Sequence, residues 1–287
     1  MNTISWEQAV IWLKEQPDKQ DLVKACYFDD NLQEAAQRFS QSEEWKAVSQ
    51  IISHQSGKAL DIGAGRGISS YALAKNGWDV TALEPDPSHL VGAGAIRSLV
   101  KETGLSIHIV EDWGERLPFE NESFDLVYGR QVLHHALNLG NFCREASRVL
   151  RPGGMLIATR EHVLSRKEDL KRFLDSHPLH HLYGGENAYL LTEYLKALEN
   201  SGLNVEKVFG SYDTPINYFP MTFEQVCMAC YSPISKIIGQ RLTVAIAHLP
   251  NLGSALTKFL AQKKSNKDNT PGRLYTFVCS KPGVMNQ

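Results

Sequence analysis

The stretch Ala59-Leu60-Asp61-Ile62-Gly63-Ala64-Gly65-Arg66-Gly67 decides the fold of this 287-residue chain. Its apolar start predicts a buried strand, and its glycines predict a turn into a helix over Ile68–Asn76, which ends at Gly77. A second strand, Val80–Glu84, ends in a carboxylate. Glycines let the backbone approach a ligand, and a helix N-terminus directs free N–H groups toward it. The two strands therefore predict a nucleotide-type pocket in which Glu84 can accept both hydroxyls of a ribose.

The glycine spacing indicates which ligand fits this pocket. A dinucleotide fingerprint is G-x-G-x-x-G and places a pyrophosphate at the helix N-terminus. Here the spacing is G-x-G-x-G, and Asp61 stands two positions before the first glycine. A carboxylate there suits a ligand that carries an ammonium group and no phosphate, and S-adenosylmethionine (SAM) is such a ligand. Because a G-x-G turn also occurs as plain strand-to-helix packing, the later segments must decide.

Those later segments carry a family resemblance. Ile107–Val110 predicts a third strand, and Glu115–Tyr128 contains Leu117-Pro118-Phe119 and leads into a fourth. Leu133-His134-His135 follows, and Glu145–Gly154 predicts a helix, a turn and the start of a fifth strand. With the first two strands, these motifs make residues 57–162 resemble the class I SAM-dependent methyltransferases related to the ubiquinone/menaquinone-biosynthesis enzymes.

The resemblance implies a set of cofactor-binding residues: Asp61, Gly63, Ala64, Gly65, Gly67, Glu84, Pro85, Asp112, Trp113, Gly129 and Arg130. Gly129 and Arg130 are expected to offer backbone carbonyls to the SAM ammonium. The family places an acidic residue six positions before Phe119 to accept the adenine amino group, but here Trp113 stands there and Asp112 precedes it. Either Asp112 still reaches the adenine, or Trp113 covers the adenine face, or Trp113 is a core residue that caps the fourth strand.

The alternation of strands and helices over residues 57–162 predicts an α/β fold with helices on both faces of the sheet. Met155–Thr159 and Leu203–Phe209 add a fifth and a sixth strand, and Glu186–Ser201 predicts a helix between them. The resemblance implies a Rossmann-like, seven-stranded, mostly parallel sheet whose last strand, Leu274–Cys279, is antiparallel and lies between strands five and six. Three regions are predicted: an N-terminal helical segment over 1–56, a SAM-binding core over 57–212 and 271–287, and a helical cap insertion over 213–270.

The ends of the chain are predicted to be helical. Apolar residues at helical spacing predict helices over 5–16 and about 19–56. By resemblance this segment packs over the cofactor, with Arg38, Phe39 and Glu43 as lid candidates, or it is a plain helical buttress. The insertion predicts a helix around 222–231, a helical stretch near 233–262 and a mobile polar loop over Lys263–Asn269. We expect it near the substrate mouth, as a cap or a surface for a homodimer.

Composition favours a cytoplasmic enzyme. The chain is 43% hydrophobic and 22% charged, and it has no apolar run of membrane-spanning length and no signal-peptide pattern at its start. A net charge of −2 argues against nucleic-acid binding. Five scattered cysteines suit a reducing compartment. Cys227 and Cys230 form one C-x-x-C, which is either a helical core pair or a metal or redox site.

Acceptor-side residues are expected beyond the carboxyl ends of strands four and five, where open α/β sheets bind ligands. These positions hold Arg130, Gln131, His134, His135, Arg160, Glu161 and His162. His134 and His135 are expected on a helix, where adjacent side chains point about 100° apart, so that one faces the cleft. Catalysis needs mainly alignment of the acceptor, and a base only when the acceptor still carries a proton.

A second polar cluster runs from His177 to Tyr189. It adds candidate substrate-binding residues to His135 and His162: His177, His180, Tyr183, Glu186 and Asn187, with Tyr218 after strand six. The candidate catalytic residues are His134, His181 and Glu161. The alternatives are a rigid helix entry in which Glu186 and Asn187 cap the first turn, or a metal site made of His177, His180, His181 and Glu186. We expect no metal.

The sequence therefore predicts SAM-dependent methyl transfer to a polar small-molecule or glycan acceptor, with S-adenosylhomocysteine (SAH) as the product. The polar histidine- and tyrosine-rich loop favours such an acceptor over a quinone-like lipid. One alternative is a SAM-binding protein without methyl transfer, which is a regulatory subunit or an enzyme that modifies SAM. A nicotinamide-dependent oxidoreductase is disfavoured by the glycine spacing and by the segments after the second strand.

Overall fold

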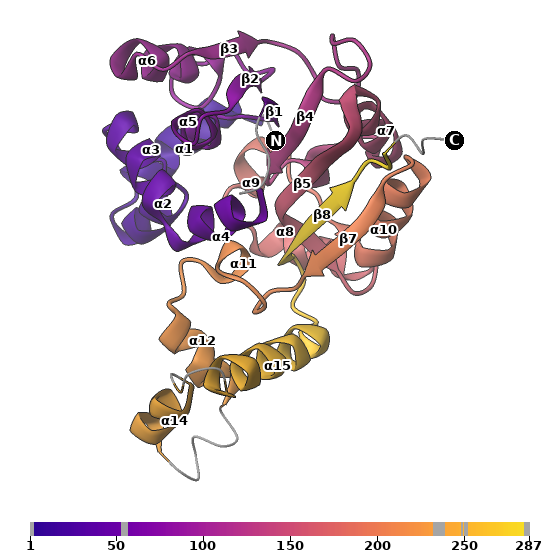
Figure 1. The fold of residues 1–287 in the computed structure, drawn as a ribbon. Helices are drawn as coiled ribbons and strands as arrows, with labels where there is room; N and C mark the ends of the chain where they lie inside the picture. The colour runs from indigo at the N-terminus through magenta and orange to yellow at the C-terminus, as the bar shows by residue number, and fades with distance from the viewer. Residues whose placement is uncertain (1–2, 53–56, 232–238, 248, 250–251, 284–287) are drawn as a thin grey trace.

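The computed structural model describes residues 3–52, 57–231, 239–247, 249 and 252–283. Its centre is a twisted sheet with the strand order β3-β2-β1-β4-β5-β8-β7 (Figure 1). The strands are β1 (Lys58–Ile62), β2 (Asp79–Leu83), β3 (Ile107–Val110), β4 (Phe124–Arg130), β5 (Leu150–Leu164), β7 (Asn204–Phe209) and β8 (Arg273–Ser280). All neighbours pair in parallel except β8, which is antiparallel to both β5 and β7. The predicted topology is confirmed.

Helices cover both faces of this sheet and build two cores. The first core joins α3 (Leu32–Gln41), α4 (Glu43–Ile52), α5 (Ile68–Lys75) and α6 (Ala93–Thr103) to one face. The second joins α7 (Leu139–Val149) and α10 (Leu191–Asn200) to the other face. Helix α5 ends as predicted, because Gly77 takes the left-handed conformation at φ +88°. The strand order reverses between β1 and β4, and open α/β sheets bind ligands at such a reversal.

The N-terminal region is helical, as predicted, but it is divided. Helix α1 (Trp6–Glu15) begins at a capping box in which the Ser5 hydroxyl accepts the Gln8 N–H. A short 3-10 turn, η1 (Pro17–Lys19), leads into α2 (Gln20–Ala25), and α3 and α4 follow. Residues 53–56 of the predicted segment lie outside the described residues. Figure 1 shows these helices grouped on one side of the sheet.

The helix predicted over Glu186–Ser201 begins five residues late, at Leu191. Two short helices precede it, α8 (Asp169–Ser176) and α9 (His180–Tyr183), and α9 ends at Gly184 with φ +74°. Beyond Gly184 the chain is not helical, and Tyr189 and Leu190 form β6 (Tyr189–Leu190) beside the end of β5. Glu193 then accepts the Leu190 N–H and fixes the helix start. The alternative in which Glu186 and Asn187 cap the helix is therefore wrong.

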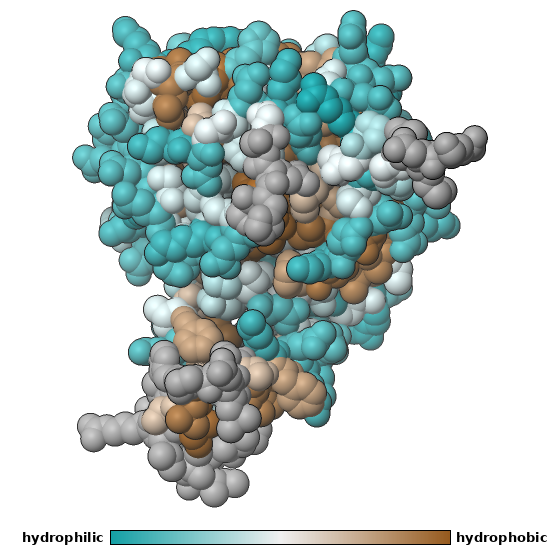
Figure 2. Space-filling view, in the orientation of Figure 1, coloured by the Kyte–Doolittle hydropathy of each residue, from teal (hydrophilic) through white to brown (hydrophobic). Residues whose placement is uncertain are grey.

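The insertion forms α11 (Pro215–Tyr218), α12 (Phe223–Cys230), α14 (Gln240–Ala247) and α15 (Leu252–Lys267). The last three project away from the sheet in Figure 1, and hydrophobic side chains gather there in Figure 2. The helix expected around 222–231 is confirmed as α12, where Cys227 packs with Tyr231 and Ala247, as a helical core residue does. Part of the stretch expected near 233–262 lies outside the described residues.

The mobile loop predicted over Lys263–Asn269 is wrong. Helix α15 continues through Lys267, and the polar residues around its end have partners. The Ser265 hydroxyl donates to Asp213 at 2.8 Å, and the Ser211 hydroxyl donates to Asp268 at 2.8 Å. Polarity alone suggested a loop, whereas these hydrogen bonds fix the segment against the chain that follows β7. No helix among the described residues combines the length and the apolar character that a membrane crossing requires.

Candidate active site

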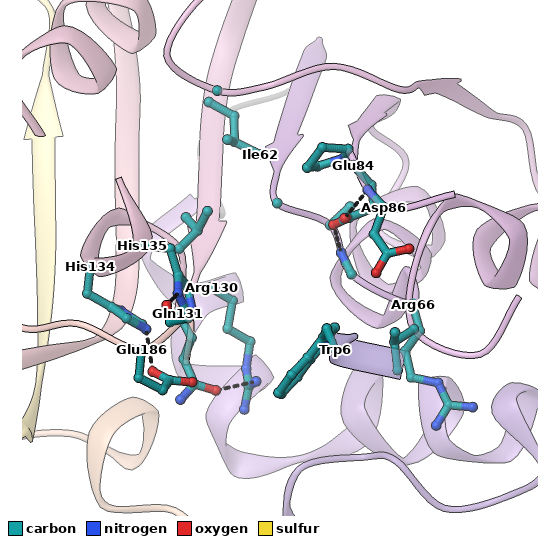
Figure 3. A pocket seen from close by; sticks show the side chains of 18 of the residues that line it. Trp6, Ile62, Arg66, Glu84, Asp86, Arg130, Gln131, His134, His135 and Glu186 are labelled. Carbon is teal, nitrogen blue, oxygen red and sulfur yellow. Dashed lines mark hydrogen bonds and ion pairs between the residues drawn. The ribbon is translucent and has the colours of Figure 1, made fainter. Parts of the chain in front are cut away.

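A cavity of about 660 Å³ opens at the carboxyl ends of β1, β2 and β4. Its wall comes from α1 and α2, from the glycine turn after β1, from the segments after β2 and β4, and from residues 177–186. In Figure 3, Glu84 and Asp86 lie on one side of it, and His134, His135 and Glu186 lie on the other. None of the residues described between 213 and 270 lines it, although the insertion was expected near this mouth.

The glycine turn needs its glycines for geometry. Gly63 and Gly65 have φ of +64° and +55°, a region that side chains other than glycine rarely adopt. A Cβ on Gly63 would also lie 2.4 Å from Val132 Cγ2. Gly63, Ala64 and Gly65 line the cavity, as predicted for the cofactor side. Gly67 does not, because it precedes α5 at φ +84° and faces Ile96.

Glu84 is the acidic cavity residue that is hydrogen-bonded to this turn. One carboxylate oxygen accepts the Gly65 N–H at 2.7 Å, and the other accepts the Asp86 N–H at 2.9 Å. The side chain is buried, and burial raises its pKa to about 7. Each oxygen still has a free lone pair for a ligand hydroxyl. Pro85 and Asp86 line the cavity next to it.

Asp61 lies behind the turn instead of at the cavity wall. It is fully buried, and one carboxylate oxygen accepts the hydroxyls of Ser69 and Ser70 at 2.7 and 2.6 Å. Burial raises its pKa to about 6. The other oxygen has no hydrogen-bond partner among the described residues. The expectation that Asp61 meets a ligand ammonium directly is corrected: its carboxylate fixes the first turn of α5 beneath the glycines.

These buried acids make stability depend on pH. For Glu84 the pKa in the folded protein is about 7, against an ordinary value of 4.5. The free energy of unfolding of the ligand-free protein should therefore fall by about 3 kcal/mol from this group as the pH rises from 4.5 to 7. Urea denaturation across this range measures the fall, and Glu84→Gln should make the dependence shallower. An equal slope in that variant would contradict the assignment.

Arg130, at the end of β4, lines the cavity with a charge that is already paired. Its Nε donates to Glu44 Oε1 at 2.6 Å and its Nη2 to Glu44 Oε2 at 3.1 Å. The guanidinium also lies over the rings of Tyr27 and Phe39. Gly129 does not line the cavity, and a Cβ there would lie 2.5 Å from Val132 Cγ1. The carbonyl expected from Gly129 accepts the Thr159 hydroxyl.

The backbone is unusual at two positions after β4 and within β5. Gln131 lines the cavity with φ +56°, and Arg160 has φ +60° at a bulge in the pairing of β5 with β8. Arg160 does not reach the cavity, because its Nη1 donates to the Ile216 and Phe219 carbonyls at 2.8 and 3.0 Å. Left-handed non-glycine residues cost energy and cluster at functional sites.

Trp113 stands at the rim of the cavity with 71% of its surface exposed. The alternative that makes it a core residue is therefore wrong. Asp112 does not line the cavity, and one of its carboxylate oxygens accepts the Trp113 N–H at 2.7 Å. Of the two adenine candidates, only the indole faces the cavity.

The other end of the cavity is built around His134. Its Nδ1 lies 2.7 Å from Glu161 Oε2, and Glu161 also accepts the N–H groups of Val132, Leu133 and His134. These donors belong to the 3-10 turn η2 (Leu133–His135) and the residue before it. Glu161 is fully buried and does not line the cavity, so its predicted catalytic role is corrected to a positioning role. Burial lowers the pKa of His134 well below its usual value, which leaves the imidazole neutral.

His134 faces further polar residues that line the same end: His135, His162, His177, Tyr183 and Glu186. His162 Nδ1 lies 2.8 Å from the Gly272 carbonyl, and burial lowers the pKa of His162 to about 3. The Tyr183 hydroxyl donates to Glu186 Oε1. The expectation that only one of His134 and His135 faces the cleft is wrong: His134 is buried and His135 is exposed, but both line the cavity.

Several predicted residues lie elsewhere: His180, His181, Asn187 and Tyr218. The single turn of α9 faces the cavity with Tyr183, so His180 and His181 point away from it. His181 is exposed and meets Trp12 edge-on at 5.9 Å. Tyr218 belongs to α11. The metal site considered from His177, His180, His181 and Glu186 is therefore not assembled.

Sequence reasoning missed the residues of α1 and α2 that line the cavity. They are apolar: Trp6, Leu13 and Leu22, with Cys26 and Phe28 just after α2. Trp6 and Leu13 stand two turns apart on one helical face, a spacing that indicated a helix but not what it covers. The lid candidates do not reach the cavity. Arg38 pairs with Asp29, Phe39 is in the core, and Glu43 pairs with Lys46.

Comparisons with known proteins agree with this geometry. Residues 60–158 match the family described as "Methyltransferase domain". A ubiquinone biosynthesis O-methyltransferase of Azorhizobium caulinodans is 32% identical over 102 residues, 36% of this chain and 39% of that protein. A sarcosine/dimethylglycine N-methyltransferase of Aphanothece halophytica is 37% identical over 105 residues, 36% of this chain and 37% of that protein. The chain thus spans about two fifths of the length of these relatives.

The fold extends beyond the matched segment. The crystal structure of geranyl diphosphate C-methyltransferase from Streptomyces coelicolor A3(2), in complex with Mg²⁺, geranyl-S-thiolodiphosphate and SAH, is 15% identical, with a TM-score of 0.56. The similarity covers 82% of this chain and 76% of that one. The glycine turn, the acid after β2 and the motifs around β4 all lie within or beside the matched residues. The chain carries a class I SAM-dependent methyltransferase domain that is distantly related to the ubiquinone biosynthesis O-methyltransferases.

Proposed function

We propose that this protein transfers the methyl group of SAM to a polar small-molecule acceptor, including a glycan-type one. One observation carries the proposal: a single cavity joins the glycine turn and Glu84 at one end to a group of histidines at the other. Its volume of about 660 Å³ lies within the usual range of small-molecule sites. The two ends thus suit a cofactor and an acceptor held side by side.

The cofactor end fits SAM through groups that are free to bind it. Glu84 keeps one lone pair on each oxygen for the ribose hydroxyls, and the exposed indole of Trp113 offers a face to the adenine. Arg130 is the remaining candidate for a backbone carbonyl toward the ammonium, because it lines the cavity and Gly129 does not. Its guanidinium is held by Glu44 and is not needed for this role.

Methyl transfer from SAM requires mainly that the acceptor atom be aligned with the methyl group. Bound SAM supplies an activated methyl group on a sulfonium, whose leaving group is a neutral thioether. The chain must hold the acceptor in line with that methyl, and correct orientation is worth about 10⁵–10⁸ M in effective concentration. Apolar side chains of α1 and α2, among them Trp6 and Leu13, line one wall and keep water from it. The neutral His134 faces the acceptor with Nε2, since Glu161 holds Nδ1.

The polar wall indicates the class of acceptor. Four histidines, a tyrosine and a carboxylate surround that end: His134, His135, His162, His177, Tyr183 and Glu186. Such groups bind hydroxyl, amine or carboxylate groups and are poorly matched to a lipid tail. The names of the two curated relatives also point to small molecules. We also propose that the chain is divided into residues 1–56, 57–212 with 271–287, and 213–270, and that it forms a homodimer.

Calorimetric titration with SAH tests the cofactor end. Glu84→Ala should weaken binding by about 1.5–3 kcal/mol, because it removes a charged acceptor of two hydroxyl hydrogen bonds. Trp113→Ala should weaken binding by about 1–3 kcal/mol if the indole stacks on the adenine. Glu199→Ala, which removes an exposed carboxylate on α10, is the matched control and should bind as the wild type does.

An acceptor screen then tests transfer. Polar small molecules are incubated with SAM, and the release of SAH is measured together with the mass of the acceptor. Methylated product that disappears when the cofactor site is mutated would support the proposal. Absence of SAH binding by the wild-type protein would remove its foundation.

A further inference from the structure

Three potential metal ligands meet at the acceptor end of the cavity. They are His134 from η2, His162 from β5 and Glu186 from the segment before β6. One donor atom from each lies within 4.8 Å of those of the other two, and all three residues line the cavity. Figure 3 shows the His134 imidazole directed at the Glu186 carboxylate. The three residues come from segments far apart in the sequence, so no local sequence motif predicts that they meet.

Both imidazoles are oriented through their second nitrogen. The Gly272 carbonyl can only accept, so His162 Nδ1, at 2.8 Å from it, carries the proton. Glu161 already accepts three backbone N–H groups, so it accepts from His134 Nδ1 as well, at 2.7 Å. Each ring therefore presents Nε2 as a bare lone pair. A carboxylate or a carbonyl behind the other nitrogen is the usual support of a metal-binding histidine.

Glu186 completes the group with an oxygen that lacks a partner. Its Oε1 accepts the Tyr183 hydroxyl and lies 3.6 Å from His177 Nε2. Its Oε2 is buried, has no hydrogen-bond partner among the described residues and lies 3.7 Å from His134 Nε2. Two lone-pair atoms thus face each other without a proton between them. A buried acceptor left in this way is costly, and a cation shared by both atoms removes the cost.

We propose that His134 Nε2, His162 Nε2 and Glu186 Oε2 bind a divalent first-row transition-metal ion. Two imidazoles and one carboxylate are typical of catalytic zinc and non-haem iron sites, which keep open positions for a substrate. With metal–ligand bonds of about 2.1 Å, tetrahedral ligands lie about 3.4 Å apart. The 3.7 Å between His134 and Glu186 is close to this, and the widest separation must shorten. Glu186 follows Gly184 and Gly185, where the backbone can adjust.

A metal ion at this site would restrict the acceptors to molecules that can bind the ion. Its open positions face the cavity, so an acceptor with a hydroxyl or carboxylate oxygen would bind there and be held toward the cofactor end. A divalent ion also lowers the pKa of a bound hydroxyl. This role rests on the proposed function, whereas the binding of the ion does not. Lone pairs that serve as ligands also leave His134 without a separate role as general base.

Metal titration of the full chain tests the site. The protein is treated with a chelator, the chelator is removed, and Zn²⁺ is added in a calorimeter, with Co²⁺ as an absorption probe of the ligand geometry. We expect one equivalent to bind with micromolar or tighter affinity. His162→Gln and Glu186→Gln should each weaken binding by more than about 100-fold, because loss of a second-shell partner alone costs 10–100-fold. His181→Gln, an exposed histidine outside the cavity, is the matched control and should leave affinity unchanged.

Parallel SAH titrations separate this proposal from the proposed function. The chelated wild type and both ligand variants should bind SAH normally, which also shows that they are folded. Absence of Zn²⁺ and Co²⁺ binding in a protein that binds SAH would overturn the metal site and leave the methyltransferase proposal intact. Binding that is equally tight in both ligand variants would place the ion elsewhere and would also overturn it. Metal binding without SAH binding would remove the proposed function instead.

Discussion

Glu161→Ala is expected to lower the free energy of unfolding by about 4 kcal/mol or more. The carboxylate is fully buried and accepts four hydrogen bonds, three from the backbone of residues 132–134 and one from the His134 ring. Each donor left unsatisfied in the interior costs about 1–3 kcal/mol. Urea denaturation measures the change. No bound ligand is needed to see it, because the network is complete within the chain.

Two further variants separate the hydrogen-bond network from simple loss of volume. Glu161→Gln keeps the size but turns one acceptor oxygen into an NH₂ donor, which then faces donors, so it should also destabilise. Glu199→Ala, on the exposed side of α10, should change stability by less than about 0.5 kcal/mol. A loss of less than about 1 kcal/mol in the free energy of unfolding of Glu161→Ala would mean that the hydrogen-bond network contributes little to stability. If Glu161→Gln folds, its Zn²⁺ affinity should fall 10–100-fold.

Glu44→Ala is expected to cost about 3–5 kcal/mol, because it leaves a buried arginine charge without its partner. Glu44 is fully buried and accepts two hydrogen bonds from Arg130, and Arg160 Nη1 lies 3.9 Å away. The adjacent Glu43 is a matched control, since its pair with Lys46 is exposed and should be worth less than about 0.5 kcal/mol. Urea denaturation of both variants gives the contrast.

A double mutant distinguishes an unpaired charge from lost packing. In Glu44→Ala with Arg130→Met, the charge that had been left without a partner is gone, so part of the loss should be recovered. The SAH affinity of Glu44→Ala should also fall if Arg130 helps to shape the cavity wall. Equal costs for Glu43→Ala and Glu44→Ala would contradict the role given to burial.

The sequence predicted the sheet well because its signals are local. The strand, the glycine turn and the second strand up to Glu84 are continuous in the chain, and the backbone geometry there allows little else. The helix placed over Glu186–Ser201 failed at its start because β6 exists only through pairing with the end of β5. Helical periodicity cannot reveal a strand pair that is made by tertiary structure.

Only part of the candidate site was predicted, because local sequence signals place residues along the chain but not their contacts in the folded protein. Glu84 and His134 line the cavity from the ends of β2 and β4, where the sequence placed them. His162 also lines it, but from inside β5, which continues to Leu164 and not only to Thr159 as expected. Position in the sequence does not tell whether a carboxylate faces the cavity or a neighbouring residue. Asp61 was expected at the cofactor and Glu161 in catalysis, whereas both carboxylates accept hydrogen bonds from the surrounding chain. The meeting of His134, His162 and Glu186 depends on distances that no spacing encodes.

Helix α1 and the segment just before it are hydrogen-bonded to chain segments at both ends of the cavity. The Glu7 carboxylate accepts the Leu90 N–H beyond β2, and just before the helix the Ile4 N–H donates to the Leu182 carbonyl of α9. Trp6 lies between them, with its ring 4.7 Å from that of Tyr183. A rigid shift of α1 that releases one end must therefore loosen the other. The two ends of the cavity thus share one support, the ten residues Trp6–Glu15 together with the segment just before them.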